Sequence, residues 1–166
     1  MNVAELLRTC SQLQDLPAAD LDALAAAVSI IKAPDGQVFV QEGDRGDGCY
    51  IVLEGKVGIS HEHARGGADF KTLGPGELFG LVALIDHGPR SASCRAVGAA
   101  SVAWLSAAAF ELLHSGSPSV ALHFRKLVAR QLARDVRVFN GVLVAAMVDN
   151  HPDDGASPTE EFHLTT

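Results

Sequence analysis

Apolar residues recur at helical spacing in two short stretches near the start of the chain, residues 3–10 and 20–28. Pro17 and Asp20, which lie between them, are typical of a turn that starts a helix. From residue 30 the pattern changes to short β-rich runs separated by glycine-containing turns. These runs are residues 38–40, 50–53, 57–60, 70–73, 94–97 and 101–105. Strands repeating at roughly 8–12 residues predict a sandwich or barrel. Together with the helices, they indicate an α+β fold that contains a jelly-roll-like β-roll.

A helical pattern returns after residue 105. Residues 106–114 predict a short helix, and Ser117-Pro118 supply an N-cap and a first-turn proline for a longer one that runs to about residue 149. At 1.5 Å per residue this long helix extends over about 50 Å. Its apolar positions repeat at three and four residues, and they include Val120, Phe124, Leu127, Val128, Leu132, Val136, Phe139, Leu143 and Met147. A stripe of this length is expected to pack against a partner.

The last residues of the chain show no hydrophobic periodicity. Residues 150–166 contain Pro152, Gly155 and Pro158 together with several acids and hydroxyls, which predicts a disordered tail. The chain has 166 residues, of which 48% are hydrophobic, and this is the size of one domain with an ample core. We therefore expect one domain over residues 1–149, which includes the long helix of about residues 117–149, and a tail over residues 150–166.

The formal net charge of −7 disfavours contact with nucleic acid and with anionic membranes. Basic residues cluster in one place, between Arg125 and Arg137. The simpler interpretation is a solvated helix face, and the more specific one is a surface that binds an acidic partner. The three cysteines, Cys10, Cys49 and Cys94, are odd in number and widely spaced, so neither a disulfide framework nor a zinc site is expected. With no export signal and no run long enough to span a bilayer, the sequence predicts a cytoplasmic protein.

The stretch from Gly74 to Arg95 organises the candidate chemistry. A Gly-Pro-Gly turn leads to Phe79-Gly80, and residues 81–85 predict a short helix that begins at Gly80. The first N–H groups of a helix have no intrahelical partner and favour an anion. Arg90 follows the loop after this helix, and its planar guanidinium suits a phosphate. The sequence therefore predicts that the helix start and Arg90 converge on one anion site, to which Ser91 adds a hydroxyl donor.

These residues resemble the phosphate-binding cassette of cyclic-nucleotide-binding domains, the module of the bacterial catabolite activator family and of the regulatory subunits of cAMP-dependent protein kinase. The family pattern is Phe-Gly-Glu-x-Ala-Leu-(Leu/Ile), a short loop, then Pro-Arg-(Ser/Thr/Ala)-Ala-(Ser/Thr). This chain has Phe-Gly-Leu-Val-Ala-Leu-Ile at residues 79–85 and Pro-Arg-Ser-Ala-Ser at residues 89–93. The resemblance continues through residues 41–57, in turn and strand residues that are structural in the family. It implies a phosphate site at Gly80, Leu81, Arg90 and Ser91, with cAMP or cGMP as the ligand.

One residue departs from the family pattern. The resemblance assigns the ribose 2′-hydroxyl to a glutamate, and Leu81, which occupies that position, cannot accept a hydrogen bond. Losing a charge-assisted bond of about 1.5–3 kcal/mol corresponds to roughly 10- to 100-fold weaker affinity. Glu77 lies four residues earlier and is a poor substitute, since acids are frequent there in the family alongside the usual glutamate. The ligand is therefore a weakly bound cyclic nucleotide or another small phosphate-containing molecule, or the site has lost its ligand.

The resemblance also implies how such a domain works. In the family the helix that corresponds to residues 117–149 pairs two protomers, so we expect a homodimer that acts as a regulatory module. A winged helix-turn-helix would have to follow this helix, and residues 150–166 are too few and too polar to form one, so direct DNA binding is not expected. No nucleophile, base and acid are arranged for catalysis, which predicts a protein that is not an enzyme and needs no cofactor or catalytic metal.

Two alternatives stay open at this point. A degenerate member of the family, favoured by Leu81, would serve as a dimerisation scaffold or bind an unidentified protein partner. A metal-dependent, cupin-like enzyme would depend on His61 and His63, because alternate residues of a strand point the same way and two imidazoles could face one metal ion. The glycines that follow at residues 66–67 instead favour an exposed hairpin tip with a solvated pair of histidines.

Overall fold

The computed structural model describes residues 3–61 and 71–149. Two short helices, α1 (Val3–Thr9) and α2 (Ala18–Ala27), precede the strands and are joined by a single 3₁₀ turn, η1 (Ser11–Leu13). The strands are β1 (Ser29–Ala33), β2 (Val38–Val40), β3 (Gly48–Ser60), β4 (Lys71–Leu73), β5 (Leu78–Phe79) and β6 (Ser93–Ser106). A one-and-a-half-turn helix, α3 (Leu81–Asp86), precedes β6, and α4 (Ala107–Gly116) and α5 (Pro118–Asp149) follow it.

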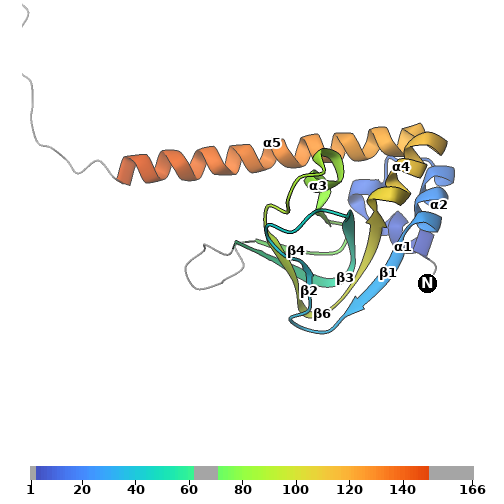
Figure 1. The fold of residues 1–166 in the computed structure, drawn as a ribbon, viewed down its shortest axis with the longest axis horizontal. Coiled ribbons are helices and arrows are strands. Elements are labelled where there is room, and N and C mark those ends of the chain that lie inside the picture. The colour runs from blue at the N-terminus through green and yellow to red at the C-terminus, as the bar shows by residue number, and fades with distance from the viewer. Residues whose placement is uncertain (1–2, 62–70, 150–166) are drawn as a thin grey trace, which may run out of the picture. The chain divides into compact units, whose positions relative to one another are not determined.

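The strands form an antiparallel sheet that curves into a roll, and α1, α2 and α4 lie together on one side of it (Figure 1). The order along the main path is β1-β6-β3-β4, with β2 also paired to β6 and β5 also paired to β3. This arrangement confirms the predicted α+β fold with a β-roll, short N-terminal helices, a cassette helix and a long C-terminal helix. The strand β1 and the short β5 are additions that the sequence pattern did not indicate.

Two pairs of predicted strands are each one long strand. The runs at residues 50–53 and 57–60 belong to β3, which continues through an irregularity between Val52 and Lys56, where the register to β6 shifts. Gly55 has φ +76°, and a Cβ atom there would lie 2.3 Å from the carbonyl oxygen of Ala99, so the bulge depends on glycine. The runs at residues 94–97 and 101–105 are likewise one strand, β6. Gly55, which suggested a turn between two strands, therefore marks a bulge within one strand.

Alternate residues of the long strands face two separate apolar clusters. Cys49, Ile51 and Leu53 of β3 belong to a helix-side cluster with side chains of α1, α2, α3, α4 and the first turns of α5. Tyr50 and Val52 belong to a strand cluster, whose other buried members are Val40, Val57, Leu73, Phe79, Cys94 and Val102. The roll therefore has a core of its own, and the helices cover its other face.

The chain divides into two compact units, Met1–Ala129 and Arg130–Thr166, and the division falls inside α5. The first turns of α5 belong to the first unit, where Val120, Phe124 and Val128 are buried in the helix-side cluster. The boundary expected from the sequence, between residues 149 and 150, stays a prediction. The predicted tail at residues 150–166 and the second histidine of the proposed metal pair, His63, lie outside the described residues. Across residues 3–61 and 71–149, no helix is both long and apolar enough to cross a bilayer.

Candidate functional site

The cassette begins where β5 leaves the sheet. Gly80 follows Phe79 with φ +74° and is the N-cap of α3, so the helix starts where the sequence predicts. A Cβ atom at Gly80 would lie 2.5 Å from Nη1 of Arg90. Both the left-handed backbone and this close approach require glycine. Because α3 has only six residues, the positive end of its dipole is weak, and the charge of the site comes mainly from the arginine.

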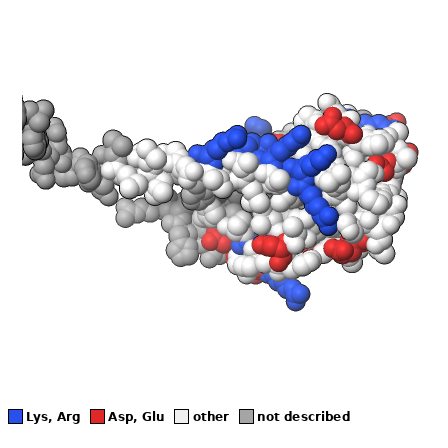
Figure 2. Space-filling model, turned by 90° about the horizontal axis from the view of Figure 1, so that it is seen from above, with Lys and Arg blue, Asp and Glu red and all other residues white. Residues whose placement is uncertain are grey.

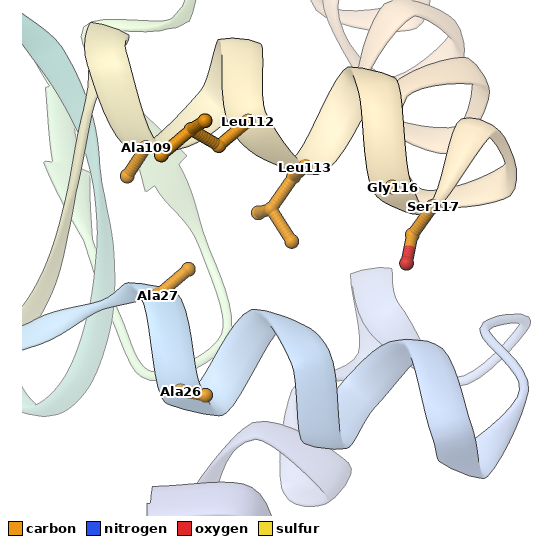
Figure 3. Close-up of a pocket in the computed structure, with 7 residues that line it drawn as sticks. All are labelled: Ala26, Ala27, Ala109, Leu112, Leu113, Gly116 and Ser117. Atoms are coloured by element: carbon orange, nitrogen blue, oxygen red, sulfur yellow. The ribbon is translucent and has the colours of Figure 1, made fainter.

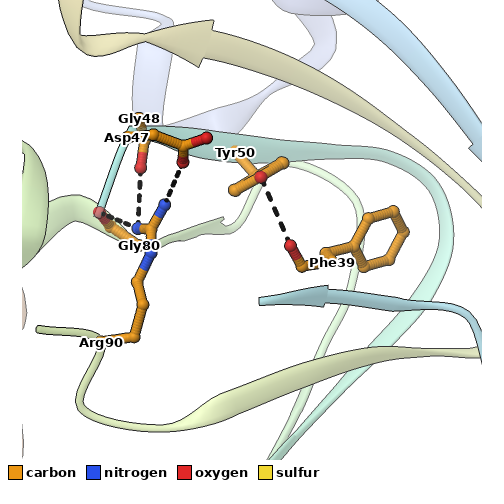
Figure 4. Close-up of polar contacts among 6 residues, drawn as sticks. All are labelled: Phe39, Asp47, Gly48, Tyr50, Gly80 and Arg90. Carbon is orange, nitrogen blue, oxygen red and sulfur yellow. Dashed lines mark hydrogen bonds and ion pairs between the residues drawn. The ribbon is translucent and has the colours of Figure 1, made fainter. Parts of the chain in front are cut away.

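Arg90 is buried, with only 6% of its surface exposed, although it lies in a loop. Its Nη1 donates to the carbonyl oxygens of Gly48, at 2.8 Å, and Gly80, at 3.1 Å, and its Nη2 donates to Oδ1 of Asp47 at 2.9 Å (Figure 4). These bonds bring the end of β5 and the start of β3 to one guanidinium. The predicted meeting of Gly80 and Arg90 is therefore present in the structure.

The backbone of Arg90 is fixed as firmly as its side chain. Its N–H donates to the carbonyl oxygen of Asp44 at 2.8 Å, and its own carbonyl oxygen accepts from the N–H of Gly43 at 2.9 Å. The loop before β3 thus holds Arg90 from both sides, through backbone bonds at Gly43 and Asp44 and an ion pair at Asp47. A side chain held this way loses little further entropy when a ligand binds.

Asp47 is the site residue that the sequence analysis treated only as a structural turn residue. Its side chain is 67% exposed, whereas the guanidinium side chain that it contacts is 4% exposed. Because the carboxylate is so exposed, the ion pair is screened by water and contributes little to stability. Its effect is to orient the guanidinium. The acid between two glycines at residues 46–48 was the available signal, since such a turn can aim a carboxylate at a neighbouring loop.

An aromatic group lies beside the guanidinium. The Tyr50 ring stacks on Phe79 with centroids 4.8 Å apart, and Phe39 packs against both rings at a tilt. The Cζ atom of Arg90 lies 5.9 Å from the Tyr50 centroid, which is within the range of a cation–π contact. Burial is the main cause that raises the pKa of the Tyr50 hydroxyl, so this ring stays neutral at physiological pH.

The two remaining predicted site residues lie differently. Leu81 is 3% exposed and belongs to the helix-side cluster, so its side chain packs toward the helices and not among the strand-cluster residues. Ser91 follows Arg90 and is exposed. Glu77 accepts a hydrogen bond from the N–H of Gly74 at 2.8 Å, which uses its carboxylate in the turn before β5. This contact agrees with the expectation that Glu77 is a poor substitute for the family glutamate.

The histidine alternative gains no support from the described part of the chain. Nδ1 of His61 lies 3.2 Å from Oε2 of Glu42, as a partly exposed pair at the end of β3. Within residues 3–61 and 71–149, no group of three or more His, Cys, Asp or Glu side chains could hold a metal ion.

A pocket of about 440 Å³ lies elsewhere, between α2 and α4 (Figure 3). It is lined by Ala26, Ala27, Ala109, Leu112, Leu113, Gly116 and Ser117, and it shares no residue with the surroundings of Arg90. Its only side-chain polar group is the Ser117 hydroxyl, so the pocket offers nothing to orient a charged ligand. The electrostatics of the chain favour the surroundings of Arg90 as the candidate site.

The cysteines near this site are expected to be chemically inert. The thiols of Cys10, Cys49 and Cys94 are buried, and burial raises the pKa of the Cys49 thiol to about 12 despite the nearby Arg90 charge. Because the thiolate is the reactive form, iodoacetamide at pH 8 is expected to modify the folded chain at least about 100-fold more slowly than the unfolded chain. Mass spectrometry of alkylated samples would measure this ratio. Rapid labelling of Cys49 under native conditions would contradict the packing of β3.

The comparison with known proteins agrees with this geometry. Residues 30–116, which run from β1 to the end of α4 and contain the whole cassette, match the profile of the cyclic nucleotide-binding domain. The chain belongs to the cyclic nucleotide-binding domain family. This cyclic nucleotide-binding domain is 34% identical over 122 residues to a cyclic nucleotide-gated potassium channel of Mesorhizobium japonicum, covering 74% of this chain and 33% of the channel.

Other relatives include a receptor protein and an activator protein of one bacterium. The Cyclic AMP receptor protein of Thermus thermophilus is 39% identical over 101 residues, covering 60% of this chain and 46% of that protein. The crystal structure of the Thermus thermophilus Catabolite Activator Protein superposes with a TM-score of 0.70 at 32% identity, over 80% of this chain and 62% of that one. The domain thus spans about a third to a half of these two curated relatives. A cAMP-bound structure, PfPKA-R, shares the fold at 23% identity and a TM-score of 0.70.

Proposed function

We propose that this domain is a non-catalytic regulatory module that binds a cyclic nucleotide, or another small phosphate-containing ligand, at Arg90, and that it signals through a dimer of α5. The observation that carries the proposal is the buried guanidinium, which Asp47 and two carbonyl oxygens orient. A buried positive charge with one exposed carboxylate as its only ion-pair partner in the described residues favours a second anion. The names of the relatives, a cyclic nucleotide-gated channel and a cyclic AMP receptor protein, support a cyclic nucleotide as that anion.

The donor count at Arg90 supports a phosphate ligand. A guanidinium has five N–H donors, and within the described residues three of them have partners. The Nε–H and one Nη2–H remain for a phosphate, which arginine commonly binds through two parallel bonds. The exposed hydroxyl of Ser91 and the backbone N–H groups at Gly80 and Leu81 would complete the anion site.

The position of Leu81 determines which part of a ligand goes unrecognised. Its side chain is apolar and packs in the helix-side cluster, and Glu77 is used in its own turn. A ribose 2′-hydroxyl would therefore meet no carboxylate at position 81, and the Glu77 carboxylate is already hydrogen-bonded to Gly74. The proposed site binds the phosphate and leaves the 2′-hydroxyl without a charged acceptor.

Calorimetry with cAMP, cGMP and 2′-deoxy-cAMP tests this function. We expect saturable binding of a cyclic nucleotide and affinities for cAMP and 2′-deoxy-cAMP that agree within about threefold, because a charge-assisted bond worth roughly 10- to 100-fold is absent. Linear AMP serves as the control for phosphate charge alone. A 2′-deoxy ligand that binds tenfold more weakly would show that another acceptor replaces the glutamate, and no saturable binding of any phosphate ligand would contradict the proposal.

The signalling step follows from shared packing within the first unit. Leu81 and Leu84 of α3 belong to the same helix-side cluster as Val120 and Phe124 of α5. A ligand that draws Gly80 and Arg90 closer together would shift α3, and the cluster would pass this shift to the start of α5. Because packed cores change between discrete arrangements, a small displacement at α3 can select a different position of the helix. The dimer surface farther along α5 would then respond.

The specific observation that favours a second function is the apolar Leu81 itself. A domain that no longer binds nucleotides would keep the fold and the α5 surface and act as a dimerisation scaffold. The hydrogen bonds of Arg90 are compatible with this scaffold function, because they also join two loops of the roll. The calorimetric experiment separates the two functions, since the scaffold predicts no heat of binding while the dimer persists.

A further inference from the structure

One side of α5 in the second unit carries positive charge. Arg130, Arg134 and Arg137 are all exposed, and at about 100° per residue they lie within roughly 60° around the helix axis. Lys126 precedes them by about one turn of the same helix, as an exposed residue. Figure 2 shows several Lys and Arg side chains close together on the face that is seen from above. We call Arg130, Arg134 and Arg137 the basic stripe.

The basic stripe is not neutralised by the residues that the structure describes. Arg134 donates to the amide oxygen of Gln131 at 3.3 Å, and no described carboxylate pairs with any of the three arginines. The acidic position within this stretch, residue 135, is about 100–160° from them around the axis by helical periodicity. Three like charges within two turns also repel one another, so an anionic occupant would stabilise the helix here.

The chain itself contains a segment of the opposite charge. Residues 150–166 follow α5 directly and contain Asp153, Asp154, Glu160 and Glu161 with no Lys or Arg. We infer that this acidic segment folds back along α5 and occupies the basic stripe. The inference goes beyond the proposed function and does not depend on ligand binding.

The lengths allow this contact. Arg137 lies twelve residues before Asp149, which is about 18 Å along the helix, and Arg130 lies about 28 Å before it. An extended chain covers about 3.3–3.6 Å per residue, so Asp154 reaches roughly 16–18 Å and Glu160 roughly 36–40 Å from the end of α5. The second acidic pair can therefore reach the whole basic stripe even after the chain reverses direction, whereas Asp153 and Asp154 lie too close to the end of α5 to pair with Arg137 and add to the negative charge of the segment.

An acidic segment fits the basic stripe better than a nucleic acid or a membrane does. The stripe is about 10 Å long, whereas a duplex or a bilayer is a much longer anion that would also meet the rest of a chain with net charge −7. Arginine pairs with carboxylates through two parallel bonds. A covalently linked segment acts at an effective concentration on the order of millimolar, so contacts that are weak as separate peptides are populated within one chain.

Paramagnetic relaxation in the full chain tests the contact. A nitroxide is attached at Ser157→Cys, since the three native cysteines are buried, and amide broadening is measured along α5 and, as an internal reference, along β1. We expect strong broadening of the amides from Arg130 to Arg137 at 50 mM NaCl, at least halved at 500 mM because the charges are screened. The variant Arg130→Glu/Arg134→Glu/Arg137→Glu and the variant Asp153→Asn/Asp154→Asn/Glu160→Gln/Glu161→Gln should each remove it.

The matched control is Lys32→Glu/Lys56→Glu/Lys71→Glu, which changes the net charge equally at positions on the strands and should leave the broadening unchanged. Broadening that survives charge reversal of the basic stripe would overturn the inference, as would its absence in the unaltered sequence. Equal broadening in a mixture of labelled and isotope-enriched chains would assign the contact to a second copy instead. Stripe-dependent binding of a 20-base-pair duplex or of phosphatidylserine vesicles, without broadening, would assign the stripe to those partners.

Discussion

Replacing Arg90 with alanine is expected to lower the affinity for a cyclic nucleotide by at least about 100-fold. Two charge-assisted bonds to the phosphate are lost, and each is worth roughly 1.5–3 kcal/mol in a buried setting. The change also leaves the carbonyl oxygens of Gly48 and Gly80 without their donor. Isothermal calorimetry at fixed ionic strength measures the change in affinity, and urea unfolding measures the accompanying loss of stability.

Two further variants distinguish ligand recognition from folding. Arg90→Lys keeps the charge but cannot make two parallel bonds, so we expect an intermediate loss of about 10-fold in affinity with a folded domain. Asp47→Asn removes only an exposed carboxylate, so it should leave the free energy of unfolding within about 1 kcal/mol while it weakens binding through a less well oriented guanidinium. A domain that keeps its affinity for the nucleotide after Arg90→Ala, while it remains folded, would place the ligand elsewhere.

The cassette was the most predictable part of the molecule. Turn residues, a helix start and an arginine occur in one short stretch, so local chemistry and spacing indicated both Gly80 and Arg90. The partners of Arg90 were harder to find, because the contact with Asp47 joins residues 43 positions apart. No periodic pattern connects such loops. Only the pairing of β3 with β5 and β6, which the sequence does not specify by itself, brings them to the same end of the roll.

The division of the apolar residues between two clusters also lay beyond the sequence pattern. In a strand that is covered on both faces, every side chain is apolar, so the alternation that marks an exposed face disappears. Residues Cys49 to Leu53 form such a run, and β3 supplies both clusters. For the same reason the sequence could identify Leu81 as a departure from the family pattern but could not tell that its side chain packs with the helices.

The long helix shows the same limit in another form. The sequence grouped its apolar residues into one stripe, whereas the structure separates them by environment. Val120, Phe124, Leu127 and Val128 are buried in the first unit, and Leu132, Val136, Leu143 and Met147 are between 42% and 65% exposed. Spacing alone does not distinguish a residue that packs within its own domain from one that is exposed and available to pack against another chain. The exposed set is what supports a proposed dimer.

Introducing negative charge into that exposed apolar set is therefore expected to separate the dimer. In the second unit Leu132, Val136 and Leu143 lie within about 40° around the helix axis, as the buried seam of a two-helix interface does. Each such side chain contributes roughly 1.5–3 kcal/mol when it is buried, and a symmetric dimer buries two copies of each. The variant Leu132→Glu/Val136→Glu/Leu143→Glu should raise the dissociation constant by at least about 1000-fold, which sedimentation equilibrium measures.

Ala145→Glu provides the control, because this exposed position lies about 200° from Leu143 around the same helix and so outside the proposed seam. Like the triple variant, it adds negative charge and changes the helix propensity, but it should leave the dimer intact. A triple variant that remains dimeric would show that α5 does not form the interface. A triple variant that is monomeric yet binds the nucleotide as well as the unaltered domain would show that the Arg90 site is complete in one copy, so that dimerisation serves the output and not the recognition of the ligand.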